Sequence, residues 1–155
     1  MKSIIAAAIL LGVCASASAQ ADKVVLEFRT MAGVSGPYVG NANPIRGIGG
    51  GGIPWILEEA RGELRRDGRL EIRVRGLVLA TTLANPAPAF RGVVSCQIID
   101  GAGAPSHVNL STEDFPASSA GDSDIEANLA LPGNCFAPII FVTNSAGRWF
   151  AVTGY

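Results

Sequence analysis

Short apolar runs, interrupted by Gly, Pro, Asn and Asp about every ten positions, are the feature that most constrains the fold of this chain. The sequence has no internal repeat, no heptad pattern and no helical periodicity that lasts beyond two turns. It therefore predicts an all-β fold, a single-domain antiparallel two-sheet β-sandwich of about eight strands, with a small β-barrel as the alternative. We expect strands at 23–31, 56–65, 69–79, 90–99, 107–111, 124–131, 138–143 and 148–153.

The segment ARGELRRDGRLEIRVRG at 60–76 is the most regular of these runs. Apolar residues such as Leu70 and Ile72 alternate with charged ones, so one face of the strand is buried and the other is in water. A three-residue loop at 66–68 pairs Leu64 with Leu70, whereas a two-residue turn would mix the two faces. We predict this three-residue loop, with Gly68 in the left-handed conformation. The same register places Arg61 opposite Arg73 and Glu63 opposite Glu71 on the wet face.

The C-terminal segment 138–153 predicts a hairpin that is apolar on both faces, with its turn at 144–147. A hairpin of this kind must be covered on both sides. We expect the cover to be the opposite sheet together with a loop of the same chain, or another subunit. The second alternative makes this hairpin a candidate surface for a homo-oligomer.

The glycine-rich stretch NPIRGIGGGGIPW raises the question of a ligand cradle. A phosphate-binding loop needs a preceding strand, a following helix and a Lys-Ser or Lys-Thr pair, and here Pro54 follows, which has no backbone N–H. We therefore predict a structural loop at 43–54 that lies flat against a neighbour and is a candidate cover for the C-terminal hairpin. Its expected anchors are Ile45, Ile48, Ile53 and Trp55.

The first nineteen residues fit a secretory signal peptide. Lys2 precedes an apolar run at 4–13, and Ala17-Ser18-Ala19 supplies the small residues of a cleavage site after Ala19. Cys14 does not fit a lipid-attachment site, because bulky Val13 precedes it. We expect a secreted or periplasmic protein whose mature part, 20–155, is one domain with no membrane span.

Cys96 and Cys135 are the only cysteines outside this signal peptide. An even pair of cysteines in an exported chain is expected to oxidise. We therefore predict a structural disulfide that ties a strand in the middle of the chain to the start of the C-terminal hairpin.

The expected mature chain holds 11 Lys or Arg against 13 Asp or Glu, a net charge of −2, so no attraction to nucleic acid is expected. Eight arginines lie within 46–91, whereas 97–147 holds six acids and no Lys or Arg. We expect the fold to interleave these two stretches, with an electrostatic partner site as the alternative.

No catalytic residue, zinc site or cofactor is predicted. His107 is the single histidine, and Ser106 beside it would point to the opposite face of a strand. A carboxylate pair of the kind that glycosidases use is the alternative, with Glu58, Asp124 and Glu126 as its candidates. Asp122 and Asp124 are the calcium candidates, although a straight strand spreads their oxygens apart.

Four aromatic residues are candidates for a ligand-binding platform that stacks on sugar rings: Trp55, Trp149, Tyr38 and Tyr155. The alternative for these residues is ordinary packing in the core or at an edge.

Four stretches resemble parts of small secreted bacterial proteins to which no activity is assigned. They are MAGVSGPYVGNANPIRGI, GELRRDGRLEIRVRGLVL, VVSCQIIDG and WFAVTGY, and the resemblance runs over 28–155. The segment 62–77 is also superficially similar to the strand pairs of chordin-type (CHRD) domains. Neither resemblance implies a role for any residue.

Taken alone, the sequence predicts a secreted binding or structural module that is not an enzyme and that binds an extracellular ligand or protein. The alternatives are an extracellular hydrolase that acts on glycans through carboxylates, and a surface protein that assembles through the C-terminal hairpin.

Overall fold

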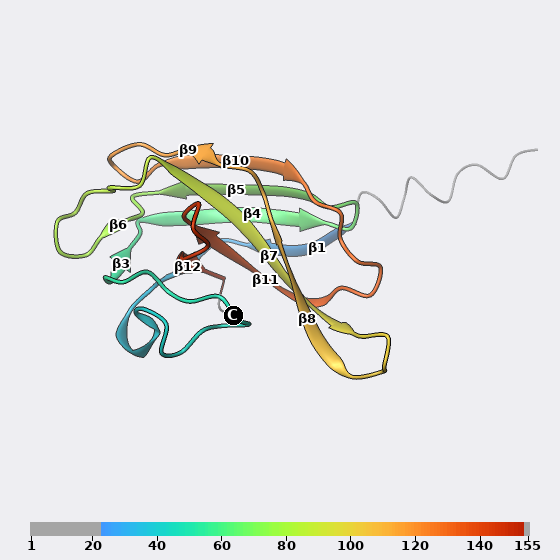
Figure 1. Ribbon diagram of the computed structural model, residues 1–155. Helices are drawn as coiled ribbons and strands as arrows, with labels where there is room; N and C mark the ends of the chain where they lie inside the picture. Colours follow the sequence, from blue (N-terminus) through green and yellow to red (C-terminus); the bar gives the residue numbers. More distant parts are fainter. Residues whose placement is uncertain (1–22, 154–155) are drawn as a thin grey trace, which may run out of the picture.

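The computed structural model describes residues 23–153, which form two antiparallel sheets packed against each other (Figure 1). The expected signal peptide, its cleavage site after Ala19, and Tyr155 lie outside these residues. The all-β sandwich prediction is confirmed, and neither sheet closes into a barrel within the described part of the chain.

The first sheet has four strands in the order β1 (Val24–Phe28), β4 (Glu59–Arg65), β5 (Arg69–Arg75) and β10 (Ser123–Asn128). The second sheet has the order β2 (Ala32–Gly33), β12 (Trp149–Val152), β11 (Phe136–Thr143), β7 (Ala89–Ile99) and β8 (Pro105–Ser111). A short strand, β9 (Phe115–Pro116), also pairs with β7. Two further short strands, β3 (Trp55–Ile56) and β6 (Val78–Leu79), pair with each other, and a 3-10 turn, η1, spans Gly36–Tyr38. In Figure 1, β7 and β11 run obliquely across the first sheet.

Each of the eight predicted strands overlaps an observed strand of at least four residues, but two of the predictions join strands that are separate in the structure. The predicted strand 56–65 is split into β3 and β4, and 69–79 is split into β5 and β6. Gly76 accounts for the split between β5 and β6, because its positive φ of 66° turns the chain after β5. The short strands β2 and β9 were not predicted, because two-residue strands leave no periodic pattern.

The predicted register of the β4–β5 hairpin is confirmed. Leu64 lies opposite Leu70, and Gly62 lies opposite Ile72. Gly68 has φ of 93° and donates its N–H to the Arg65 carbonyl at 3.0 Å, which closes the loop. The alternation of apolar and charged residues therefore fixes which side chains of these strands face solvent.

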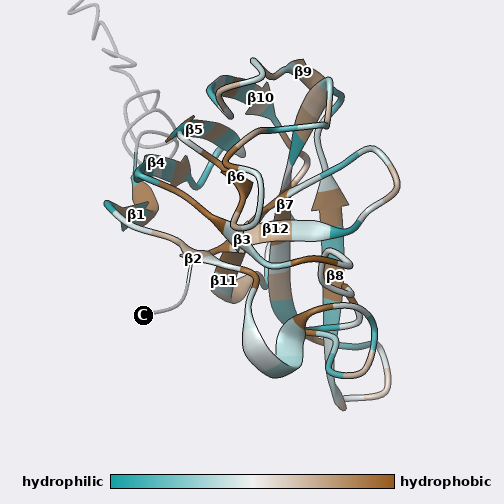
Figure 2. Cartoon of the chain, turned by 90° about the vertical axis from the view of Figure 1, so that its left-hand side faces the viewer, coloured by the Kyte–Doolittle hydropathy of each residue, from teal (hydrophilic) through white to brown (hydrophobic). Residues whose placement is uncertain are grey.

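The core lies between the sheets and continues into an aromatic cluster under the C-terminal hairpin. Gly92 lets β7 approach the first sheet closely, since a Cβ at this position would lie 2.9 Å from Cδ1 of Ile72. Trp55 stacks on Phe150 with ring centroids 3.9 Å apart, and Phe90 meets both rings edge-on. In Figure 2, hydrophobic colour dominates β6 and β11, whereas β4, β5 and β10 carry much hydrophilic colour.

The glycine-rich loop covers the C-terminal hairpin, as the sequence predicted. Gly50 forms a parallel bridge with Trp149, and the Gly51 N–H donates to the Trp149 carbonyl at 2.9 Å. A side chain at Gly51 would crowd the aromatic rings beside it, since a Cβ there would lie 3.1 Å from Nε1 of Trp55 and 3.2 Å from Cδ1 of Phe150. All four residues of β12 are buried. One expected anchor was wrong: Ile53 is 45% exposed, because it lies beyond the segment that pairs with β12.

Arg46 fastens this loop to three strands of the second sheet. Its guanidinium donates to the carbonyls of Ser95 on β7 and Ala137 on β11, at 2.7 and 2.8 Å. The Asn109 side chain on β8 donates to the Arg46 carbonyl at 3.0 Å. The cover that the hairpin needs is therefore supplied, at least in part, by the same chain.

The predicted disulfide between Cys96 and Cys135 is present, with the two Cα atoms 5.0 Å apart. It ties β7 to the segment just before β11. The expected interleaving of charges is also observed, because Arg73 and Arg91 from the arginine-rich stretch pair with Asp124 and Asp114 from the acidic one. Residues 23–153 contain no helix long and apolar enough to cross a membrane.

Candidate functional site

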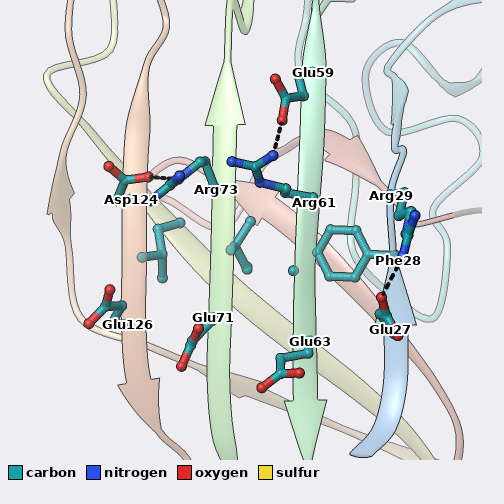
Figure 3. A pocket seen from close by; sticks show the side chains of 13 residues that line it. Glu27, Phe28, Arg29, Glu59, Arg61, Glu63, Glu71, Arg73, Asp124 and Glu126 are labelled. Atoms are coloured by element: carbon teal, nitrogen blue, oxygen red, sulfur yellow. Dashed lines mark hydrogen bonds and ion pairs between the residues drawn. The ribbon is translucent and has the colours of Figure 1, made fainter.

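The open face of the first sheet carries a groove of about 610 Å³ that is lined by residues from all four strands (Figure 3). The glycine-rich loop, by contrast, lies over part of the second sheet. The first sheet therefore offers a broad charged surface that is open within the described residues.

Four glutamates form a continuous row across this groove. Glu63 on β4 lies opposite Glu27 on β1, and also opposite Glu71 on β5. Glu71 in turn lies opposite Glu126 on β10. Figure 3 shows the four side chains at the same level of four neighbouring strands. We call these residues the glutamate row.

The register of the core fixes the position of the glutamate row. The next residues along the four strands, Phe28, Gly62, Ile72 and Ile125, lie opposite one another and turn inward, so their neighbours in sequence must turn outward. Gly62 is required in this layer, since a Cβ there would lie 2.0 Å from the Glu71 carbonyl oxygen and 2.7 Å from Cζ of Phe28. The apolar layer and the glutamate row thus depend on the same strand pairing.

A second row of charges borders the glutamate row and is neutralised within the chain. Arg61 pairs with Glu59 at 3.1 Å, and Arg73 pairs with Asp124 at 3.0 Å. Arg75 donates to both carboxylate oxygens of Asp124, at 2.9 and 3.0 Å. The arginines of this sheet are therefore directed mainly to acids outside the glutamate row.

The glutamate row itself is only partly neutralised. Arg65 donates to Glu63 at 2.6 Å, and Arg29 reaches Glu27 at 3.5 Å. The side-chain carboxylates of Glu71 and Glu126 have no hydrogen bond or ion pair with any other residue of 23–153. Two carboxylates that are neighbours in the row therefore point into the groove without a partner from this part of the chain.

The Asp124 carboxylate is held in its ionised form. Partial burial by itself raises its pKa, but the hydrogen bonds and positive charges of Arg75 and Arg73 outweigh that effect and leave the pKa below its usual value. Asp124 therefore suits the role of a fixed anion that orients Arg73 beside the groove. A general acid would need a raised pKa instead.

The structure separates the predicted carboxylate candidates. Asp124 and Glu126 both line the groove, whereas Glu58 does not and lies against Gly76. Asp122 accepts a hydrogen bond from the Gly76 N–H at 3.0 Å. No three His, Cys, Asp or Glu side chains within the described residues converge as metal ligands would, so the glutamate row is spread out rather than gathered around one point.

Two of the four predicted aromatic residues, Tyr38 and Trp149, line a second pocket of about 390 Å³ beside the second sheet, whereas Trp55 does not line it. Trp55 and Trp149 are buried, with exposed fractions of 4% and 2%, because both pack into the core. Tyr38 is 45% exposed and lies against Trp149 with ring centroids 6.4 Å apart. His107 lies on the exposed strand β8, outside the groove.

The sequence predicted one pair of the glutamate row but not the complete row. The hairpin register already placed Glu63 opposite Glu71. Glu27 and Glu126 join them only because β1 and β10 flank this hairpin, and no local pattern states which strands become neighbours. Alternation within β10 did indicate that Glu126 faces outward with Asp124.

Comparison of the chain with protein-family models, with curated proteins and with solved structures finds no match. The site must therefore be interpreted from its own geometry and charge.

Proposed function

We propose that this protein is a secreted binding module without a catalytic role, and that its groove holds a linear polycation along the glutamate row. The supporting observation is the row itself, four carboxylates directly opposite one another, of which Glu71 and Glu126 have no partner within 23–153. The disulfide is consistent with a location outside the cytoplasm.

The glutamate row does not contribute to the stability of the fold. Like charges directly opposite each other on neighbouring strands are destabilising, by roughly 0.2–1 kcal/mol per pair. A glutamine or threonine would fill the same exposed positions without repulsion. Local patterns that oppose folding are expected mainly at functional positions. A cationic ligand would turn this repulsion into charge-assisted hydrogen bonds.

The geometry favours a chain of cations over a single metal ion. Neighbouring strands lie roughly 4.8 Å apart, so the row extends over about 14 Å. Its carboxylates do not converge on one point. Amino groups spaced along a linear molecule would match this arrangement.

The test is a titration with spermine, a linear tetra-amine, followed by calorimetry at low salt. We expect saturable binding that weakens as salt is added, because exposed charges are screened. Glu71→Gln and Glu126→Gln should each weaken binding severalfold. The matched control is Glu113→Gln, which lies outside the groove and should leave binding unchanged. No binding, or equal loss in the control, would overturn the proposal.

The glycan hydrolase stays a separate prediction, tested by turnover of a glycan panel before and after Glu126→Gln. The lowered pKa of Asp124 disfavours this residue as the general acid of a glycosidase, whereas an ionised carboxylate suits the nucleophile or base of such an enzyme, so turnover decides between the two proposals. Self-assembly through the C-terminal hairpin also stays a prediction; the burial of all four residues of β12 within the chain reduces the surface that it could use.

A further inference from the structure

The edge strands of the two sheets differ in how they are protected from pairing with another chain. Unpaired edges normally carry charges, are very short, or are covered. Glu27 lies on edge strand β1, Asp124 and Glu126 lie on edge strand β10, and β2 is only two residues long. The seven residues of β8, PSHVNLS, include no Asp, Glu, Lys or Arg. Among the described residues, β8 is the long edge strand that lacks a charge.

The backbone of β8 presents regularly spaced free groups at this edge. The Thr112 N–H donates to the Gly92 carbonyl, and the Asp100 N–H donates to the Ala104 carbonyl, so even-numbered residues of β8 face β7. The odd-numbered residues therefore direct their N–H and C=O groups away from the sheet. His107, Asn109 and Ser111 offer donors there, whereas Pro105 offers only its carbonyl. Figure 1 shows the β7–β8 hairpin projecting from the body of the molecule.

The strand is complementary to itself. If two copies meet antiparallel about a twofold axis at Val108, His107 lies opposite Asn109 of the second copy, and Pro105 lies opposite Ser111. All seven residues then pair, and every outward group faces another outward group except the Ser111 carbonyl, which faces Pro105, a residue without an N–H. No like charges meet, in contrast to what β1 or β10 would produce in the same arrangement.

We infer that β8 pairs with β8 of a second copy, so that two molecules join their second sheets into one continuous sheet. The surface differs from the C-terminal hairpin, and it leaves the groove on the first sheet open in both copies. A single pair of edge strands buries less area than a standard stable interface, so the dimer is weak and reversible.

The test is sedimentation equilibrium of the full mature chain from about 10 μM to about 1 mM, combined with backbone amide hydrogen exchange. We expect dimers at the upper concentrations. The amides of His107, Asn109 and Ser111 should gain protection as dimers form, while the outward amides of β1 and β10 should not.

The decisive variants are His107→Pro and its matched control His107→Ala. Proline removes an outward N–H without removing a ladder bond to β7, whereas alanine keeps the N–H. We expect His107→Pro to raise the dissociation constant by tenfold or more, since two intermolecular hydrogen bonds are lost. His107→Ala should change it little. A monomer at every concentration, or a dimer equally stable in both variants, would overturn the inference. Circular dichroism of each variant verifies that it is folded.

Discussion

At the scale of single residues, Gly62 allows the close packing within the first sheet. It lies between Phe28 and Ile72 in the inward layer, and its lack of a side chain makes room for the Phe28 ring and the Glu71 carbonyl. We predict that Gly62→Ala destabilises the protein by about 1–3 kcal/mol, as overpacking does in a core. Urea denaturation measures this effect. An unchanged or raised midpoint would show that the close contact is relaxed without cost.

The carboxylate of Asp124 makes the stability of the protein depend on pH. Its pKa is lowered in the fold, so its contribution is present above the pKa of the unfolded chain, about 4, and is lost as the pH falls through the lower folded value. We predict that the wild type loses more stability than Asp124→Asn between about pH 4 and pH 2. Urea midpoints across this range measure the difference, and parallel curves for the two proteins would contradict it.

At the scale of elements, the glycine-rich loop should be able to open without unfolding the sandwich. Arg46 holds it through hydrogen bonds to the carbonyls of Ser95 and Ala137. We predict that Arg46→Ala speeds amide exchange at Gly50 and Gly51 by about tenfold or more, since each bond from a charged donor contributes roughly 1.5 kcal/mol or more. Exchange in β4 and β5 should stay unchanged. Faster exchange throughout the chain would instead make the loop part of the global folding unit.

The disulfide also acts at the scale of elements. It joins β7 to the start of β11 and closes a loop with a sequence separation of 39 residues. In the chain-entropy view, a loop of about this length contributes about 4 kcal/mol. We predict that replacing both Cys96 and Cys135 by alanine lowers the free energy of unfolding by about this amount, measured by urea denaturation. Reduction of the wild type should give a similar loss, and a loss below about 1 kcal/mol would contradict the account.

The sequence could predict those parts of the fold that depend on local alternation. The β4–β5 register followed from the need to pair Leu64 with Leu70, and turn geometry leaves few alternatives. The sequence could not predict that Trp55 and Trp149 would both be buried, because burial depends on the distant strands that surround them. The complete glutamate row could not be predicted for the same reason, because the order of the strands in the sheet depends on contacts between distant parts of the chain.

At the scale of the whole molecule, the two sheets differ in their outward faces. The second sheet is covered in part by the glycine-rich loop and tied by the disulfide, and it ends in the uncharged edge β8. The first sheet leaves the groove open. Under our two proposals, the second sheet carries the structural and association contacts and the first sheet receives the ligand.

We propose that the glutamate row opposes folding and serves binding. The free energy of unfolding of Glu71→Gln tests both parts of this proposal together. At low salt and without ligand, we predict that Glu71→Gln is more stable than the wild type by about 0.4–2 kcal/mol, because a repulsive pair is removed on each side. With spermine present, the wild type should gain stability and Glu71→Gln should gain less, while Glu113→Gln should match the wild type in both conditions. If Glu71→Gln is no more stable than the wild type and gains as much from spermine, the claim is contradicted.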